Sequence, residues 1–116
     1  MSWLKQASPF SLIPKAVSSH PWYLILYVTS RCNQKCNMCF YWQELNNFKK
    51  SQEFTLDEYK KIAQNFPDLF QLTITGGEPT LRDDLADIVE IFYKTCRPRR
   101  VTIASNGSRP DQLERL

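Results

Sequence analysis

The stretch Trp22-Tyr-Leu-Ile-Leu-Tyr-Val-Thr29 decides the fold class, because every residue in it is apolar, β-branched or aromatic. A short continuous run of this kind is typical of a strand buried on both faces, as the strands of parallel sheets are. Two further strands are predicted at 69–75 and at 100–105, the first ended by glycines and the second by an Asn-Gly pair. A sheet of at least these strands is therefore expected.

Helical patterns separate the three predicted strands. Thr55-Leu-Asp-Glu58 is a capping box that opens a helix, which Pro67 is expected to stop. Asp83 or Asp84 can cap a second helix, and a further helix-compatible stretch starts at Pro110. The apolar positions at helical spacing are Leu56, Tyr59, Ile62, Ala63 and Phe66 in the first helix, and Leu85, Ile88, Val89 and Phe92 in the second. Alternating strands and helices predict an α/β fold with a parallel sheet and right-handed crossovers.

Three polar segments directly follow the predicted strands. They are the cysteine segment (31–42), the Gly-Gly-Glu-Pro segment (76–79) and the Ser-Asn-Gly segment (105–107). The carboxyl ends of parallel strands lie at one edge of a sheet, which is where α/β proteins place their active sites. We therefore expect the three segments to converge on one face.

Composition and length set limits on the kind of protein. The 116 residues are 42% hydrophobic and 13% aromatic, and 15 basic against 12 acidic residues leave a charge of +3. Disorder is thus not expected, and the length is too short for a complete (β/α)8 barrel, which needs about 200 residues or more. Residues 1–20 are predicted to be an N-terminal extension of a domain that starts at residue 21.

Targeting and charge patterns favour a cytoplasmic protein. No apolar run approaches the length of a membrane-spanning helix, and the run at 22–28 precedes no small-residue cleavage site. The basic run at 97–100 is more typical of a solvated connection than of a phosphate contact. Neither a membrane nor a nucleic acid is expected as a partner.

The cysteines indicate a metal site. Cys32, Cys36 and Cys39 supply three thiolates from one short segment, which suits zinc or an iron–sulfur cluster better than a disulfide framework. Structural zinc sites use four protein ligands, so three ligands suggest an open position for another molecule. Cys96 instead continues the apolar face of the second helix and is predicted to be a buried core thiol.

These residues resemble the motifs of a known family. Cys32-Asn-Gln-Lys-Cys36-Asn-Met-Cys39 resembles the CxxxCxxC motif that follows the first strand in radical S-adenosylmethionine (SAM) enzymes. Thr75-Gly76-Gly77-Glu78-Pro79 resembles the GGEP motif of that family, and Ser105-Asn106-Gly107 its pattern after the third strand. The resemblance covers residues 22–107. It implies a partial TIM-type (β/α) barrel, namely the first three β/α units of a radical SAM core. Residues 21–116 would then be the N-terminal part of a radical SAM core domain that is incomplete at its C-terminus.

The resemblance also implies cofactors. Cys32, Cys36 and Cys39 would hold a 4Fe-4S cluster whose open iron chelates the amino and carboxylate groups of SAM. An electron from the reduced cluster would cleave SAM to methionine and a 5′-deoxyadenosyl radical, which abstracts hydrogen from a substrate. The protein would position the cofactor, set its potential and exclude water.

Further contacts to SAM follow from the same resemblance. Backbone groups of Gly76, Gly77, Glu78 and Pro79 would surround the SAM ammonium, with Glu78 either contacting SAM or bracing the loop. Met38 stands where the family commonly has an aromatic residue against the adenine; a thioether can pack there, and Phe40 can compensate. Ser105 and Asn106 are candidates for polar contacts to SAM or substrate, although an Asn-Gly pair is often only a turn.

Two alternatives remain open at this point. The chain could be a non-enzymatic zinc- or iron–sulfur-binding module with one further ligand, or an inactive truncated remnant. The radical SAM interpretation implies a low-potential electron donor of the flavodoxin or ferredoxin type. It leaves the substrate unknown, either a peptide or a small molecule, and the chain alone is expected not to turn over.

Overall fold

The computed structural model describes residues 21–47, 49 and 52–116. Its elements in chain order are β1 (Tyr23–Thr29), α2 (Leu56–Ala63), β2 (Gln71–Gly76), the short 3-10 helix η3 (Pro79–Leu81), α3 (Leu85–Cys96), β3 (Arg100–Ile103) and α4 (Pro110–Glu114). The predicted α/β class is confirmed. The predicted extension at 1–20 lies outside the described residues. No helix in the described part of the chain is long and apolar enough to cross a membrane.

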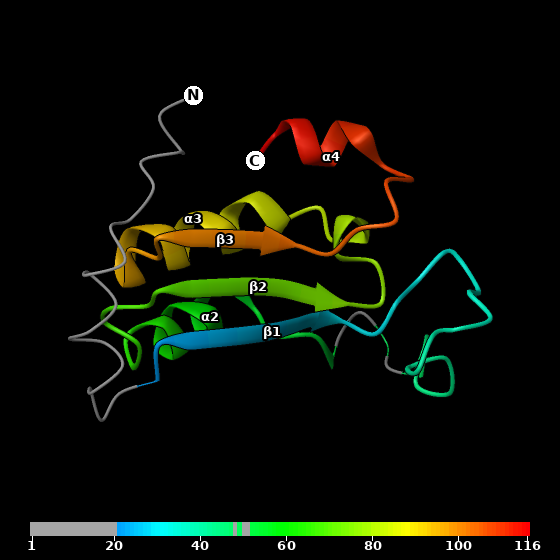
Figure 1. Ribbon diagram of the computed structural model, residues 1–116, viewed down its shortest axis with the longest axis horizontal. Coiled ribbons are helices and arrows are strands. Elements are labelled where there is room, and N and C mark those ends of the chain that lie inside the picture. Colours follow the sequence, from blue (N-terminus) through cyan, green and yellow to red (C-terminus); the bar gives the residue numbers. More distant parts are fainter. Residues whose placement is uncertain (1–20, 48, 50–51) are drawn as a thin grey trace.

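The three strands form one parallel sheet in the order β1-β2-β3. In the register, Tyr23 pairs with Gln71, which pairs in turn with Arg100. Figure 1 shows the three strands pointing the same way, with the cysteine segment and the two other strand-end loops beyond their tips. The predicted convergence of the three loops at one edge is therefore confirmed.

The core lies between the sheet and helices α2 and α3, which cover one face of it (Figure 1). Its buried apolar residues are Leu26 and Val28 of β1, Leu72 and Ile74 of β2, Tyr59 and Ala63 of α2, Leu85, Ile88, Phe92 and Cys96 of α3, and the connecting Leu69. Cys96 is fully buried, and its thiol donates to the carbonyl of Ala63 at 3.3 Å. The prediction of a core thiol is confirmed.

The prediction that β1 is buried on both faces is wrong for the described residues. Tyr23, Ile25 and Tyr27 alternate with the core residues and are 44–53% exposed. Successive side chains of a strand point to opposite faces, and α2 and α3 cover only one of them (Figure 1). The other face of β1 therefore presents a row of half-exposed apolar side chains.

The capping residues predicted from the sequence match only some of the observed helix ends. The Thr55 capping box is present: the Thr55 hydroxyl accepts from the Glu58 N–H at 3.3 Å, and the Glu58 carboxylate accepts from the Thr55 N–H at 2.7 Å. Helix α2 ends at Ala63 rather than beside Pro67, because the following residues make tighter turns. Asp84 occupies the N-cap of α3 but makes no capping hydrogen bond, since its carboxylate binds Arg82 instead.

Candidate functional site at the carboxyl edge of the sheet

The Gly-Gly-Glu-Pro segment is pressed against the start of the cysteine segment. The N–H groups of Gly77 and Glu78 donate to the carbonyls of Thr29 and Arg31, both at 2.8 Å. A Cβ atom on Gly76 would lie 2.3 Å from the Thr29 oxygen, and one on Gly77 would lie 2.1 Å from the Arg31 oxygen. Gly76 also has a φ of +132°, which side-chain-bearing residues rarely adopt. These glycines therefore permit a close approach to the main chain at the end of β1 and at the start of the cysteine segment.

Glu78 is buried and braces two loops. Its carboxylate accepts from the Thr80 N–H at 3.2 Å and the Thr80 hydroxyl at 2.5 Å. It also accepts from the Ser105 hydroxyl at 2.8 Å and the Asn106 N–H at 2.7 Å. Burial raises the pKa of Glu78, but these hydrogen bonds outweigh it and hold the pKa below its ordinary value of 4.5. Glu78 therefore braces the turn after β3, and a contact of Glu78 to SAM stays a prediction.

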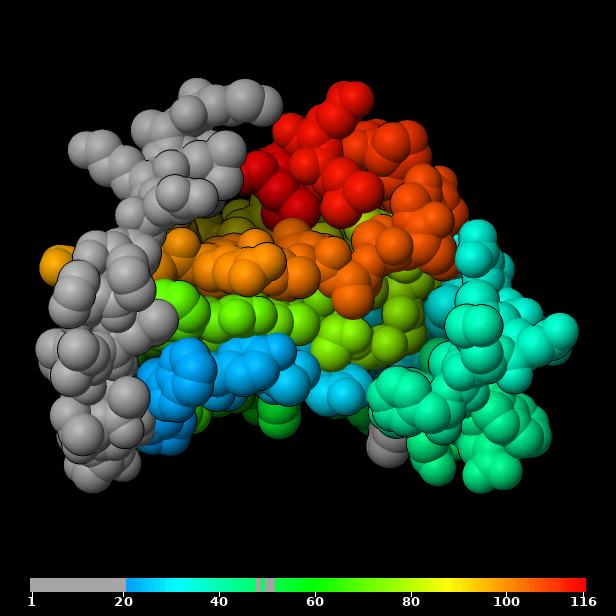
Figure 2. Space-filling view, viewed as in Figure 1, coloured from blue at the N-terminus to red at the C-terminus, as the bar shows by residue number. Residues whose placement is uncertain are grey.

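The predicted ligand residues of the cysteine segment lie in the open. Figure 2 shows this segment, coloured cyan to blue-green, projecting beyond the sheet. Cys36 is exposed, Cys32 and Cys39 are partly exposed, and all are free thiols. Met38 and Phe40 are 93% and 85% exposed, so both are accessible to a bound molecule. A hollow of about 700 Å³ lies beside Cys32 and Cys36.

The three thiols suit an iron–sulfur cluster by their chemistry, since soft thiolates are the usual ligands of such clusters. Within the described residues, however, no three Cys, His, Asp or Glu side chains are gathered closely enough to hold a metal ion. Two of the thiols line a hollow of about 700 Å³ and all three are at least partly exposed, so a cluster has access to them. The donor set therefore fits the implied group.

A charge network that the sequence did not reveal lies behind the cysteine segment. Arg31, directly before Cys32, binds the Glu53 carboxylate at 2.9 and 3.2 Å, and the Thr29 hydroxyl donates to the same carboxylate. The Nη1 atom of Arg82 lies 3.6 Å from the Oε2 atom of Glu53, and the Arg82 side chain is 5% exposed. Burial raises the pKa of Glu53, but its bonds to Arg31 and Thr29 and the nearby arginines lower it overall. The network fixes the backbone that leads into the first cysteine.

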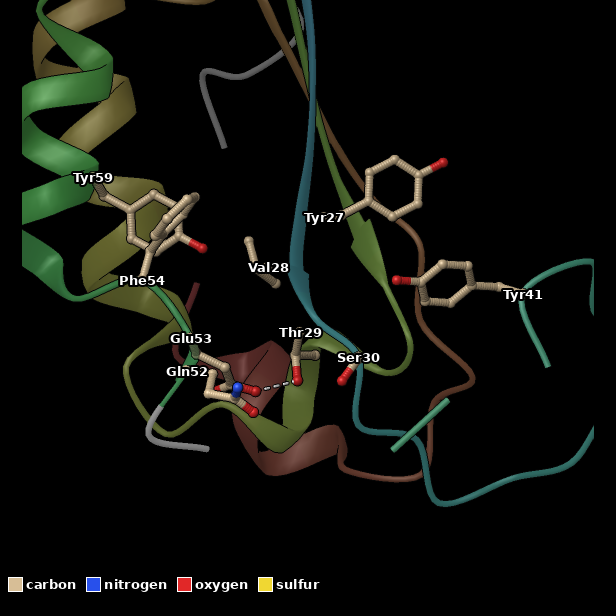
Figure 3. Close-up of a pocket in the computed structure, with 9 residues that line it drawn as sticks. All are labelled: Tyr27, Val28, Thr29, Ser30, Tyr41, Gln52, Glu53, Phe54 and Tyr59. Atoms are coloured by element: carbon tan, nitrogen blue, oxygen red, sulfur yellow. Dashed lines mark hydrogen bonds between the residues drawn. The ribbon is translucent and has the colours of Figure 1, made fainter. Parts of the chain in front are cut away.

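A smaller pocket of about 220 Å³ lies at the end of β1. Figure 3 shows Tyr27 and Tyr41 on one side of this strand and Phe54 and Tyr59 on the other. The Ser30 hydroxyl beside it is buried and has no hydrogen-bond partner within the described residues. Pockets for small molecules usually enclose about 300 Å³ or more, so we assign no ligand to this one.

The sequence profile of the Radical SAM superfamily matches residues 26–116. This chain belongs to the radical SAM superfamily. The radical SAM chain is 36% identical over 92 residues to a GTP 3′,8-cyclase of Haemophilus ducreyi, a match that covers 78% of this chain and 27% of the relative. It is 37% identical over 87 residues to a GTP 3′,8-cyclase of Synechococcus elongatus, covering 73% of this chain and 27% of that protein.

The radical SAM chain thus spans about a quarter of the length of the curated relatives it matches. The match confirms the predicted family, its enzymatic character and the interpretation of the sheet as part of a β/α radical SAM core. The roles of the individual cysteines and of Met38, Phe40, Ser105 and Asn106 in binding stay predictions.

Proposed function

We propose that Cys32, Cys36 and Cys39 bind a 4Fe-4S cluster and that SAM binds beside it, against the Gly-Gly-Glu-Pro segment. The observation that carries this proposal is the placement of three free thiols at the same sheet edge as that segment, where the Glu78 N–H donates to the carbonyl of Arg31, the residue directly before Cys32. Membership of the radical SAM superfamily supports the same assignment. The bound cluster would supply the electron that cleaves SAM to a 5′-deoxyadenosyl radical.

The chain's own residues would position these groups. Lys35, which directly precedes Cys36, would offset part of the negative charge of a thiolate-bound cluster, whereas Glu53 already balances the charge of Arg31. Arg31 is held by Glu53, so its position is set before any ligand arrives. Met38 and Phe40 are exposed in the same segment and would pack against the adenine of SAM.

Anaerobic reconstitution tests the proposal. The chain should take up about four irons and four sulfides, and added SAM should alter the spectrum of the cluster. Cys36→Ala should abolish cluster retention, whereas the matched variant Cys96→Ala should retain the cluster and lose only packing. One tightly bound zinc with no response to SAM would support a non-enzymatic zinc module instead, and no metal binding at all would support an inactive remnant.

The proposed reaction also needs an electron donor and a substrate. A low-potential flavodoxin- or ferredoxin-type protein would supply the electron. The relatives named GTP 3′,8-cyclase make GTP the first substrate to test. Adding GTP to the reconstituted, SAM-loaded chain should shift the electron paramagnetic resonance spectrum of the reduced cluster. An unchanged spectrum with GTP, in a sample that does respond to SAM, would reject GTP as a ligand of this chain.

A further inference from the structure

Asn106 joins all three loops at the carboxyl edge of the sheet. Its backbone N–H donates to the buried Glu78 carboxylate at 2.7 Å. Its side-chain amide donates to the Asn33 side-chain oxygen at 2.9 Å, and its side-chain oxygen accepts from the Ser108 N–H at 2.9 Å. Asn33 completes the link by donating to the Ser108 hydroxyl at 2.8 Å. Asn33 is the residue directly after Cys32, and it lies 73 positions from Asn106 in the chain.

The cysteine segment has few other attachments around its first two thiols. The Asn46 side chain binds the backbone N–H and carbonyl of Cys32 at 3.2 and 3.4 Å. Between Asn33 and Cys36, the bonds of the Asn33 side chain are the only hydrogen bonds to another segment among the described residues. The position of this span therefore depends on the turn that follows β3.

The far end of the link is buried and held by several hydrogen bonds. Glu78 is 1% exposed and is held by both polar groups of Thr80 as well as by Ser105. Asn106 is attached to this carboxylate through its backbone, so its side chain projects toward Asn33 from a fixed base. Asn106 therefore links a firmly held carboxylate, that of Glu78, to a span that has few other hydrogen bonds. A residue in such a place can position that span.

We propose that Asn106 is a positioning residue that acts through Asn33 to hold the Cys32–Cys36 span in place for metal binding. The metal-binding part of this inference rests on the proposed function; the link between the two asparagines does not. Asn106 would then contribute to the site without touching SAM or substrate. This role differs from the direct ligand contact that the sequence predicts for it.

The first test uses the metal-free chain and NMR relaxation. Asn33→Ala and Asn106→Ala should each lower the backbone 15N order parameters of residues 33–36 from values typical of rigid backbone to values below about 0.6. Asn33→Asp keeps the oxygen that accepts from Asn106 and should preserve the wild-type order. Asn37→Ala is the matched control, because its side chain makes no hydrogen bond within the described residues. Unchanged order in both alanine variants, or equal loss in Asn37→Ala, would overturn the proposal.

The second test uses Co²⁺, whose thiolate absorption reports binding to the cysteines. Each alanine variant loses the hydrogen bond between the two asparagines and one further bond to Ser108, and this should weaken Co²⁺ affinity about fivefold to tenfold. Both variants break the same link. The double variant should therefore bind Co²⁺ no more weakly than the single variant with the lower affinity, whereas independent effects would multiply the two losses of affinity. Multiplying effects would refute the link. If the wild-type chain binds no Co²⁺ and no cluster, the proposed function fails, and the NMR result still decides the positioning role.

Discussion

Arg82 and Asp84 form a two-pronged ion pair in which the Nε and one Nη of the arginine each lie 2.8 Å from a different carboxylate oxygen. The same guanidinium donates to the carbonyls of Val28 at 3.0 Å and Phe54 at 2.9 Å. One buried side chain therefore connects the end of β1, the approach to α2 and the start of α3. The loop that leads into the first cysteine depends on this connection.

Replacing Arg82 should destabilise the fold strongly. Arg82→Met removes one ion-pair partner of Asp84 and one of Glu53, and breaking such a largely buried network costs about 3 kcal/mol. Urea denaturation followed by circular dichroism measures the loss. The control is Lys94→Met, which breaks the exposed pair of Lys94 and Glu90 on α3 and should cost about 0.5 kcal/mol. Equal losses in the two variants would contradict the assignment of Arg82 as a structural tie.

The thiols should differ sharply in reactivity. Burial raises the pKa of Cys96 to about 11, so little thiolate is present at pH 8, while Cys36 is exposed. We expect iodoacetamide to modify Cys36 within minutes in the folded, metal-free chain and to leave Cys96 intact until the chain unfolds. Peptide mass spectrometry over time measures both rates. Comparable rates at the two positions would show that Cys96 does not lie in the core.

Glu78 should make stability depend on pH. Its pKa is lowered in the folded chain, so its contribution is fully present above the ordinary value of 4.5 and is lost as the pH falls through the folded value. Glu78→Gln should therefore cost about 1–3 kcal/mol at pH 7, and the gap to wild type should shrink at pH 3.5. Denaturation at both pH values tests this. A gap that stays constant would show that the carboxylate does not titrate differently on folding.

Replacing a glycine by alanine should lower the stability of the fold more at Gly77 than at Gly107. Gly77→Ala would place Cβ 2.1 Å from the Arg31 carbonyl oxygen, a backbone atom that cannot rotate away, and should cost about 3 kcal/mol. Gly107→Ala meets no atom within 4 Å but has a φ of +73°, so it should cost about 1–2 kcal/mol. Thermal denaturation compares the two. A larger loss at Gly107 would contradict the packing of the two segments.

Local and periodic signals in the sequence predicted much of this fold. The Thr55 capping box, the order of strands and helices, and the core position of Cys96 all rest on near neighbours or on helical spacing, and the structure contains them. The outer face of β1 was mispredicted, because an apolar run does not tell which of its faces another layer covers.

The contacts within the candidate site were less predictable. The cysteines and the glycine pair were found through their spacing, but the links from Glu78 to Asn106 and from Arg31 to Glu53 were not. Each of those pairs joins residues more than 20 positions apart, and neither glutamate stands in a periodic pattern that would point to its partner. Only the three-dimensional arrangement brings these groups together.

The packing of Gly76 and Gly77 against the end of β1 serves the fold rather than the chemistry. Their lack of side chains answers a steric demand of two crossing main chains, and that demand exists whether or not the chain performs chemistry. A variant that had lost its thiols would still be under the same steric demand. The glycine pair therefore reports the shape of this sheet edge, whereas the capacity for radical chemistry has to be judged from the cysteines.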